Sequence, residues 1–234
     1  TNVLFVDESI FPQNLAVIQT RVIPQGMKIQ VGNYKELEFT PEIFACIIQY
    51  PNASGSVEDY REFVEKAHAA NCKVAVNADI LSLALLLPPG EWGADIVFGS
   101  TQRLGIPLFY GGPSAAYFAT RDEYKRNMPG RIIGLSKDKY GKICYRMALQ
   151  TREQHIKREK ATSNICTAQA LLATMAGFYA VYHGQEGIKN IAKRIHSIAT
   201  WLNKALARLG YVQHNEIFFD TLRFSLPDHV SAQK

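Results

Sequence analysis

The chain has 234 residues, with 47% hydrophobic and 20% charged residues and a formal net charge of +5. This composition excludes a disordered or fibrous chain and predicts a folded protein of one large domain or somewhat more. Lys and Arg are spread along the chain, with one denser run at residues 152–160 and no interleaved aromatic stripe, so nucleic acid is not an expected partner. A basic surface facing an anionic cofactor or an acidic partner protein explains the excess equally well.

Four cysteines, Cys46, Cys72, Cys144 and Cys166, lie far apart in the sequence. Without a CxxC spacing they predict reduced, mostly buried thiols rather than a metal site or a disulfide framework. No signal peptide is found, and the apolar run at residues 80–87 is too short to span a membrane. We therefore expect a cytoplasmic protein, or one of the mitochondrial matrix if the source is eukaryotic, with no membrane partner.

The first hundred residues alternate between short apolar runs and amphipathic segments. Strands are predicted at Val3–Val6, Met27–Val31, Ala45–Tyr50, Lys73–Val76 and Ala94–Phe98. Helices are predicted at Pro12–Ile23 and after Ser56, where Asp59 would complete a capping box. Strand–helix–strand at this spacing predicts an α/β fold with a mostly parallel sheet and helices on both faces.

A polar, glycine-rich loop follows the strand at residues 94–98. It opens with Gly99-Ser-Thr-Gln-Arg103 and returns through Tyr110-Gly-Gly-Pro113 to an apolar run at residues 115–119. Loops of this kind at the carboxyl edge of a sheet carry chemistry in α/β proteins, which makes Gln102, Arg103 and Tyr110 candidate site residues. An ordinary surface turn is the alternative interpretation.

The second half of the chain predicts a short helix, a hairpin and two long helices. A short helix is expected at residues 121–127, then a hairpin at 132–149 with its turn at 137–142, and then a polar run at 150–160. Thr162, Ser163 and Asn164 are N-capping residues before a helix that ends at Gly184, and a second long helix at 187–209 is closed by Gly210. A strand is expected at 218–224, without sheet partners. We expect residues 1–210 to form a partial large domain and residues 211–234 to begin a truncated small one. The missing first Met and the late strand predict an excised piece.

Several motifs closely resemble those of glycine cleavage system P-proteins. They are Gln49-Tyr-Pro51, Pro88–Gly93, Gly99–Arg103, Tyr110–Pro113, Met128–Arg131, Ala148–His155, Arg158–Thr167 and Phe218–Thr221. The resemblance covers essentially the whole chain. It implies a fold-type I enzyme that depends on pyridoxal phosphate (PLP), built from two homologous halves. This chain resembles the large domain of the amino-terminal half.

The resemblance also implies that the Schiff-base lysine lies in the other half. An ungapped overlay of the two halves places the lysine position at Arg103. It places the aspartate that pairs with the cofactor's pyridine nitrogen at Val76, with Asp79 three residues further on. A guanidinium stays protonated in proteins and cannot form the imine. We therefore expect no catalytic residue in this chain and no covalently held PLP.

In the fold that the resemblance implies, each active site lies at an interface and takes residues from its neighbour. Residues 162–164 would contact the phosphate of PLP held by the other half, with N-capping alone as the alternative. Arg152 and His155 would face the substrate carboxylate or the partner half, with a surface role equally open. Gln102 and Arg103 would lie at the substrate or the interface. Tyr110 would approach the cofactor across the interface, with core packing as its alternative.

For the whole enzyme, the resemblance implies decarboxylation of glycine with PLP as electron sink. The remaining aminomethyl group passes to the lipoyl group of the H-protein, so the lipoamide of the H-protein is a co-substrate. Expected partners are the other half or subunit, glycine and H-protein, an acidic carrier that the basic charge of this chain would help to dock.

Two alternatives stay open: a degenerate module kept for assembly, and another fold-type I enzyme such as a desulfurase or lyase. A lysine at the position equivalent to Arg103 in an adjacent segment or subunit would favour the decarboxylase. The sequence leaves open whether the native protein is one chain or two subunits.

Overall fold

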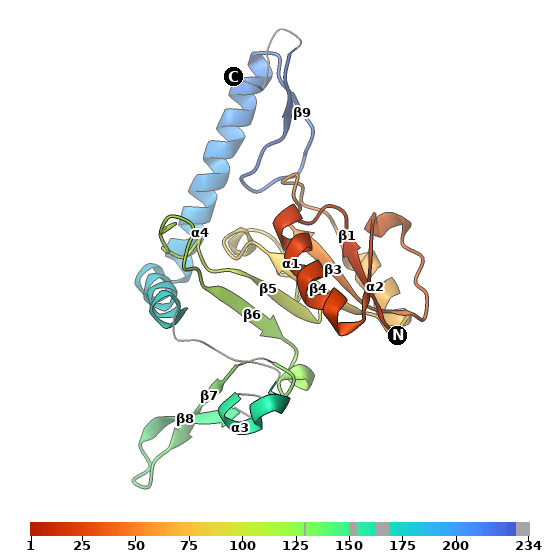
Figure 1. The fold of residues 1–234 in the computed structure, drawn as a ribbon. Coiled ribbons are helices and arrows are strands. Elements are labelled where there is room, and N and C mark those ends of the chain that lie inside the picture. Colours follow the sequence, from red (N-terminus) through yellow and green to blue (C-terminus); the bar gives the residue numbers. More distant parts are fainter. Residues whose placement is uncertain (129, 150–153, 162–168, 228–234) are drawn as a thin grey trace. The chain divides into compact units, whose positions relative to one another are not determined.

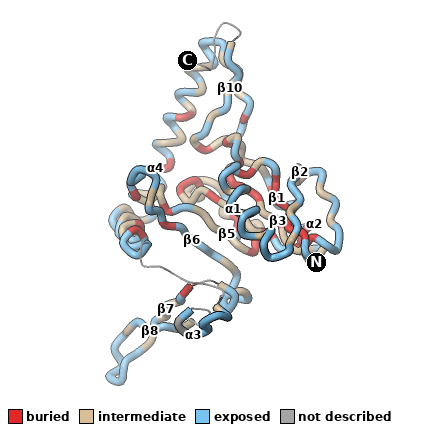
Figure 2. Tube along the Cα trace, in the orientation of Figure 1, coloured by how far each residue is buried: buried red, intermediate tan, exposed pale blue. Residues whose placement is uncertain are grey.

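The computed structural model describes residues 1–128, 130–149, 154–161 and 169–227. The chain divides into two compact units, one formed by Thr1–Ala119 with Leu172–Lys234 and the other by Thr120–Leu171. Figure 1 shows the elements of both, and Figure 2 shows that the buried residues gather in the sheet of the first unit.

A six-stranded sheet of order β2-β1-β3-β4-β5-β6 organises the first unit (Figure 1). Its strands are β1 (Val3–Asp7), β2 (Lys28–Gly32), β3 (Ile43–Tyr50), β4 (Lys73–Ala78), β5 (Ile96–Ser100) and β6 (Ala116–Thr120). β1 pairs with β2 and β3, β3 with β4 and β4 with β5, and all four pairings are parallel. The predicted parallel α/β sheet is confirmed.

Helices cover both faces of this sheet, as predicted. Successive residues of a strand point to opposite faces. Leu4 of β1 accordingly packs with apolar residues of α1 (Pro12–Val22), and Phe5 packs with those of α2 (Arg61–Ala69). Phe5 is fully buried, and burial of one such side chain contributes roughly 1.5–3 kcal/mol to stability. Short 3-10 helices connect the strands at Ile23–Gln25, Tyr34–Glu36 and Ser82–Ala84.

Helix α4 (Ala170–Arg208) is kinked at Gly184, whose φ of 61° and ψ of −179° are not helical. The predicted end of one helix at Gly184 and start of another are therefore confirmed. Gly210 follows the second segment with a φ of 84°, in the left-handed region that glycine adopts readily at a helix end. The second segment packs its buried Ala192 on Leu81 and Phe219. The predicted N-capping residues 162–164 lie outside the described residues.

The second unit contains the antiparallel hairpin of β7 (Ile132–Lys137) and β8 (Ile143–Leu149), which confirms the predicted hairpin and turn. The helix predicted at residues 121–127 is one 3-10 turn at Asp122–Tyr124. Within the polar run, α3 spans Gln154–Lys157 and a 3-10 helix spans Arg158–Lys160.

The capping box predicted at Ser56 is wrong, because α2 begins at Arg61 with no side-chain cap. The Ser56 N–H donates to the Asn52 side chain, and Ser56 forms an isolated bridge with Phe218. The Asp59 carboxylate instead accepts from the Arg61 N–H. Local spacing could not reveal the bridge to a segment more than 150 residues away.

The strand predicted at residues 218–224 is wrong in extent. Only β10 (Phe224–Ser225) is a strand, and it pairs with β9 (Val212–Gln213), so the predicted lack of sheet partners is also wrong. Phe219 is instead buried in the core, where its exposed fraction is 1%. Asn215 orders this segment by accepting from the Arg223 N–H and donating to the Thr221 carbonyl. The predicted domain boundary after residue 210 stays a prediction.

Cys46 and Cys72 are free and buried, with their Sγ atoms 3.4 Å apart, and Cys144 is free and partly exposed. The hydrogen bond with Cys72 and burial both raise the pKa of Cys46, so it stays a thiol. Cys166 lies outside the described residues.

Among the described residues, no helix combines the length and apolar character needed to cross a bilayer. That part of the chain also contains no group of three or more His, Cys, Asp or Glu able to hold a metal ion.

Asp95, just before β5, is a buried carboxylate held by hydrogen bonds. Its Oδ2 accepts from the Val74 N–H at 2.8 Å and lies 2.9 Å from His68 Nε2. Burial alone would raise the pKa of Asp95, but these hydrogen bonds outweigh it and keep the pKa below the usual 3.8. Asp95 therefore stabilises the fold above its unfolded-state pKa, and this contribution is lost as the pH falls through the lower folded-state pKa.

We expect Asp95→Asn to lower the free energy of unfolding by about 1–3 kcal/mol at pH 7, because buried donors lose a charged acceptor. Urea unfolding at pH 7 and in steps below pH 4 should show the difference from wild type shrinking as Asp95 becomes protonated. Glu62→Gln, at a carboxylate whose side chain is 80% exposed, is the control and should change stability little. A loss that is the same at every pH would contradict this account.

Candidate functional site at the carboxyl edge of the sheet

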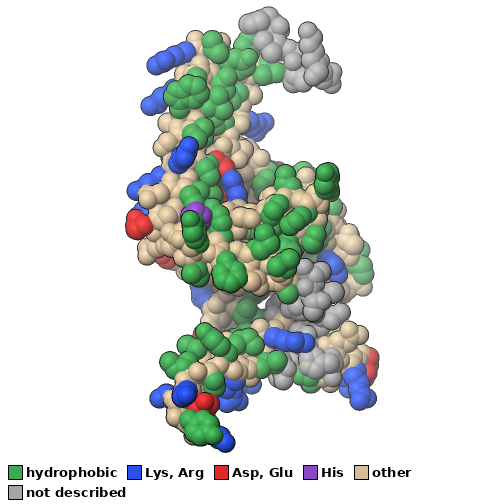
Figure 3. All heavy atoms as spheres, turned by 90° about the vertical axis from the view of Figure 1, so that its left-hand side faces the viewer, with side chains coloured by type: hydrophobic (Ala, Val, Ile, Leu, Met, Phe, Trp, Pro, Cys, Tyr) green, Lys and Arg blue, Asp and Glu red, His purple; other side chains and the backbone are tan. Residues whose placement is uncertain are grey.

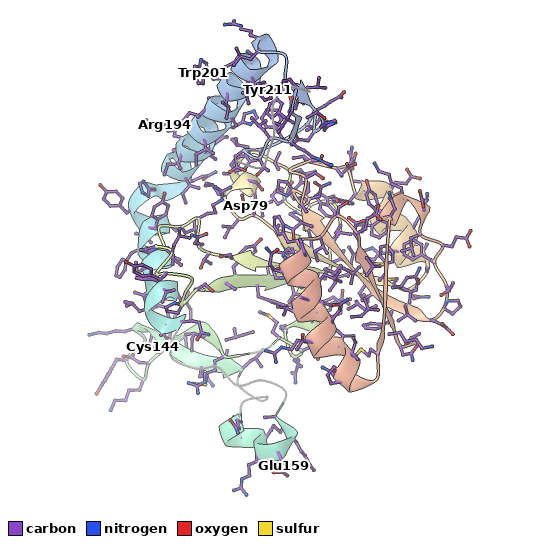
Figure 4. All side chains as sticks on the ribbon, turned by 45° about the horizontal axis from the view of Figure 1, so that its top comes forward. Asp79, Cys144, Glu159, Arg194, Trp201 and Tyr211 are labelled. Atoms are coloured by element: carbon purple, nitrogen blue, oxygen red, sulfur yellow. The ribbon has the colours of Figure 1, made fainter. Side chains whose placement is uncertain are left out.

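Three charged side chains meet at the carboxyl edge of the sheet in the first unit. Asp79 directly follows β4, Arg103 follows β5, and Asp220 comes from the segment after α4. Parallel strands present their carboxyl ends at one edge, which brings Asp79 and Arg103 together although 24 residues separate them. Figure 4 labels Asp79 at this edge.

Arg103 bridges the two carboxylates. Its Nη2 and Nε donate to Asp79 Oδ2 at 2.8 and 3.2 Å, and Nη2 also donates to Asp220 Oδ2. The guanidinium carbon lies 5.8 Å from the ring centroid of Phe219, in a cation–π contact. The side chain of Arg103 is 35% exposed, and those of Asp79 and Asp220 are 21% and 18% exposed. The ion pairs are thus shielded from solvent without being fully buried.

The electrostatics of this cluster keep Arg103 charged. Burial opposes the positive charge, but the hydrogen bonds with Asp220 and Asp79 outweigh it and raise the pKa of the guanidinium. A group that is already protonated at any physiological pH is held even more firmly in that state. Arg103 can pair with anions and position neighbouring groups, but it cannot act as a base or nucleophile.

Both carboxylate oxygens of Asp79 accept hydrogen bonds from within the chain. Oδ2 accepts from Arg103, and Oδ1 accepts from the Leu81 N–H at 3.1 Å. The Asp79 N–H donates to the Tyr50 carbonyl at 3.0 Å and so extends the pairing between β4 and β3 past its end. These contacts hold Asp79 in one orientation at the edge of the sheet.

Strands β4 and β5 approach each other very closely beside the site. A Cβ atom on Gly99 would lie 2.2 Å from the Ala78 carbonyl oxygen, so no other residue fits there. The Tyr117 hydroxyl donates to the same oxygen at 2.8 Å. Burial, followed by the charge of Asp79, raises the pKa of Tyr117 and keeps it a neutral donor. The strand spacing that aligns Asp79 with Arg103 therefore depends on Gly99.

Aromatic rings fill the space at the carboxyl end of β3. Tyr50 packs edge-on to Tyr60 and Trp92, with ring centroids 6.3 and 5.8 Å apart. The Tyr60 hydroxyl donates to the Gln49 carbonyl at 3.2 Å. Tyr50 and Tyr60 are 5% and 2% exposed, so this part of the edge is hydrophobic core.

The two positions considered for the aspartate that pairs with the cofactor's pyridine nitrogen, Val76 and Asp79, lie in different surroundings. Val76, at which the ungapped overlay put the aspartate, is fully buried within β4. Asp79 is the residue that lies at the strand end, three positions on, and it contacts Arg103. Strand β4 extends two residues further, to Ala78, than the predicted strand, and this places Asp79 directly after the strand end.

The other predicted residues of the central loop lie apart from the ion pairs. The Gln102 N–H donates to Ser100 Oγ at 3.1 Å. Tyr110 is fully exposed, which argues against core packing as its role. Phe109 and Tyr110 have φ values of 44° and 57°. Their backbones thus lie in the left-handed region, which residues other than glycine and asparagine adopt only with strain. Strain of this kind persists most often at functional sites.

Five further predicted residues remain predictions. Residues 162–164 and Arg152 lie outside the described residues, and for His155 only its backbone, in α3, is described. Asp220, by contrast, was not among the predicted site residues, because 117 residues separate it from Arg103. The only sequence signal for it was the Phe218–Thr221 motif in the resemblance.

A comparison with protein families matches the model of the glycine cleavage system P-protein to residues 1–234. The chain belongs to the P-protein family. Similar P-protein sequences include the glycine dehydrogenase (decarboxylating) of Bacteroides thetaiotaomicron strain VPI-5482, 79% identical over 233 residues, and that of Nostoc punctiforme, 58% identical over 225 residues. These alignments cover 100% and 96% of this chain but 25% and 23% of the relatives. The chain thus spans about a quarter of the length of the curated relatives it matches.

Solved structures agree with the family. A glycine decarboxylase (P-protein) of the glycine cleavage system, in inhibitor-bound form, has a TM-score of 0.86 and 33% identity; the match covers 93% of this chain and 52% of that one. The cysteine desulfurase CsdA of Escherichia coli has a TM-score of 0.61 with 17% identity, over 96% of this chain and 56% of that chain. At that identity the likeness concerns the fold alone. The P-protein chain thus has the fold-type I architecture of PLP-dependent enzymes, as predicted.

Proposed function

We propose that this chain is a non-catalytic part of a PLP-dependent glycine decarboxylase and completes an active site whose cofactor is attached elsewhere in the protein. The whole enzyme would release CO2 from glycine and pass the aminomethyl group to the lipoyl group of the H-protein. Membership of the P-protein family supports the reaction class. The single observation that carries the accessory role is the double ion pair of Arg103.

The residues at the carboxyl edge do not fit a covalently attached PLP. An imine requires an amine that can lose its proton, and Arg103 is a guanidinium neutralised by Asp79 and Asp220. Both oxygens of Asp79 already accept hydrogen bonds, Oδ1 from the Leu81 N–H and Oδ2 from Arg103. Lys73 lies at the amino end of β4, the end opposite to the site.

The contribution of this chain is instead to shape the pocket of the other half. Tyr110 supports a contact across an interface. Its ring is exposed and its backbone is strained, and a contact with the other half would offset the energy of that strain. We propose that residues 162–164 contact the cofactor phosphate and that Gln102, Arg152 and His155 face the substrate or the partner half. Hydroxyl and backbone N–H groups before a helix suit an anion of this kind.

Mapping of the cofactor attachment in the full-length protein tests the proposal. The PLP-loaded enzyme is reduced with borohydride, digested and analysed by mass spectrometry for the lysine that carries the cofactor. We expect the modified lysine outside the 234 residues described here, at the position equivalent to Arg103 in the other half. A modified lysine within these residues would overturn the accessory role. A full-length protein that takes up no PLP at all would overturn the decarboxylase itself.

A further inference from the structure

The excess positive charge of the chain lies in its second unit. Residues 120–171 contain twelve Lys and Arg against five Asp and Glu, a net charge of +7. The rest of the chain contains fourteen against sixteen, a net charge of −2. Lys and Arg occur along the whole chain, but the net positive charge belongs to this one small unit, which contains the denser basic run at residues 152–160.

The hairpin of this unit has an uncovered hydrophobic face. The pairs Ile133–Met147, Leu135–Tyr145 and Lys137–Ile143 lie opposite one another, and the period of two places all six side chains on one face. Its five apolar residues are 39–80% exposed: Ile133, Leu135, Ile143, Tyr145 and Met147. We call these five residues and Lys137 the hairpin face.

Lysines gather at the turn end of the hairpin face. Lys137 belongs to the face, and Lys139 and Lys142 lie in the turn, all three exposed. The carboxylate of Asp138 accepts from the N–H groups of Tyr140 and Lys142, so it is used in forming the turn. In the lowest part of the view in Figure 3, hydrophobic side chains lie next to Lys and Arg side chains.

The hairpin face needs a partner on physical grounds. A two-stranded hairpin is marginally stable by itself in water. Among the described residues of the second unit, Gly130 alone is buried, so the unit has no hydrophobic core there. An apolar patch bordered by charges is typical of a protein interaction site.

We propose that the hairpin face and its lysines dock an acidic protein, which under the proposed function is the H-protein that carries the lipoyl group. This inference rests on the proposed function and adds the place on this chain at which the H-protein would dock. Charge complementarity selects the occupant: a second copy would oppose lysines to lysines, which is unfavourable. The patch is mainly aliphatic, whereas surfaces that bind single-stranded nucleic acid present aromatic stacking platforms, so a protein is favoured over RNA.

The test uses the full-length protein with Lys137→Glu, Lys139→Glu and Lys142→Glu combined. We expect the KM for H-protein to rise roughly tenfold or more at low salt and its salt dependence to weaken, because steering charges are reversed. The kcat at saturating H-protein and the spectral response of bound PLP to glycine should stay the same. Lys189→Glu, Lys193→Glu and Lys204→Glu, the same change of charge at exposed positions of α4, form the matched control and should alter the KM less than twofold or so.

A second variant tests the apolar contacts. Leu135→Thr with Tyr145→Thr keeps residues that favour strands but removes hydrophobic area, so the KM for H-protein should rise while its salt dependence stays that of the wild type. An unchanged KM in both variants, or an equal rise in the α4 control, would overturn the proposal. So would loss of assembly or a lowered melting temperature of the full-length variants, because the hairpin face would then contact the rest of its own chain.

Two controls separate the remaining outcomes. If RNA binding of the wild type is abolished by the three lysine changes while the KM for H-protein is unaffected, the surface binds nucleic acid and the proposal is overturned. Failure of the proposed function would appear differently, as wild-type protein whose PLP spectrum does not respond to glycine.

Discussion

Gly99→Ala is expected to lower the free energy of unfolding by about 3 kcal/mol or more, measured by urea-induced unfolding. The added Cβ would lie 2.2 Å from the Ala78 carbonyl oxygen and 2.8 Å from the Tyr117 ring. The ring can shift, but the carbonyl belongs to the backbone of β4 and cannot move without separating β4 from β5. The substitution therefore also separates Asp79 from Arg103.

Gly90→Ala is the matched control, because a Cβ on Gly90 would meet nothing within 4 Å. We expect a change within about 0.5 kcal/mol for that variant. A Gly99→Ala protein as stable as Gly90→Ala would contradict the close strand spacing on which the site depends.

Arg103→Ala is expected to lower the free energy of unfolding by about 1–3 kcal/mol. Removal of one partner from a fully buried ion pair costs about 3–5 kcal/mol, and partial exposure of Arg103 reduces this value. The substitution leaves the carboxylates of Asp79 and Asp220 facing each other without a cation. Hydrogen exchange should consequently increase in the segment around Asp220, which Arg103 ties to the sheet.

Two variants sharpen this result. Arg61→Ala removes the same side chain from a surface pair with Asp59 in which Arg61 is 66% exposed, and should change the free energy of unfolding little. Arg103→Lys keeps the charge but loses the planar fork, so it should fall between wild type and Arg103→Ala. An Arg103→Ala protein that unfolds and exchanges like wild type would show that the double ion pair does not hold this edge together.

Predictions from the sequence were correct where the signal is local. The alternation of apolar runs and amphipathic segments located β1, β3, β4, α1 and the hairpin within a few residues. Glycine marked the kink at Gly184 and the end of α4, because its left-handed conformation is available without steric cost. The capping box at Ser56 was wrong since a distant bridge, to Phe218, competes for that segment.

The site was only partly predictable. Arg103 was found from the loop after β5, and its chemistry follows from the residue type alone. The overlay put the aspartate position at Val76 and noted Asp79 three residues on, and only the observed end of β4 at Ala78 shows that Asp79 reaches Arg103, because strand ends are placed from a pattern only to within two to four residues. Asp220 was missed because only the packing of Phe219 against the sheet edge brings that segment near Arg103.

The sequence by itself determined the family, the parallel α/β class and the absence of an amine at position 103, since these depend on residue identity and on short-range periodicity. Only the tertiary structure decided that Arg103 is neutralised by two carboxylates and that the basic excess accompanies an uncovered hairpin face. Both depend on distances between residues far apart in the chain. Such distances are set by how the strands and helices pack, and no local pattern contains them.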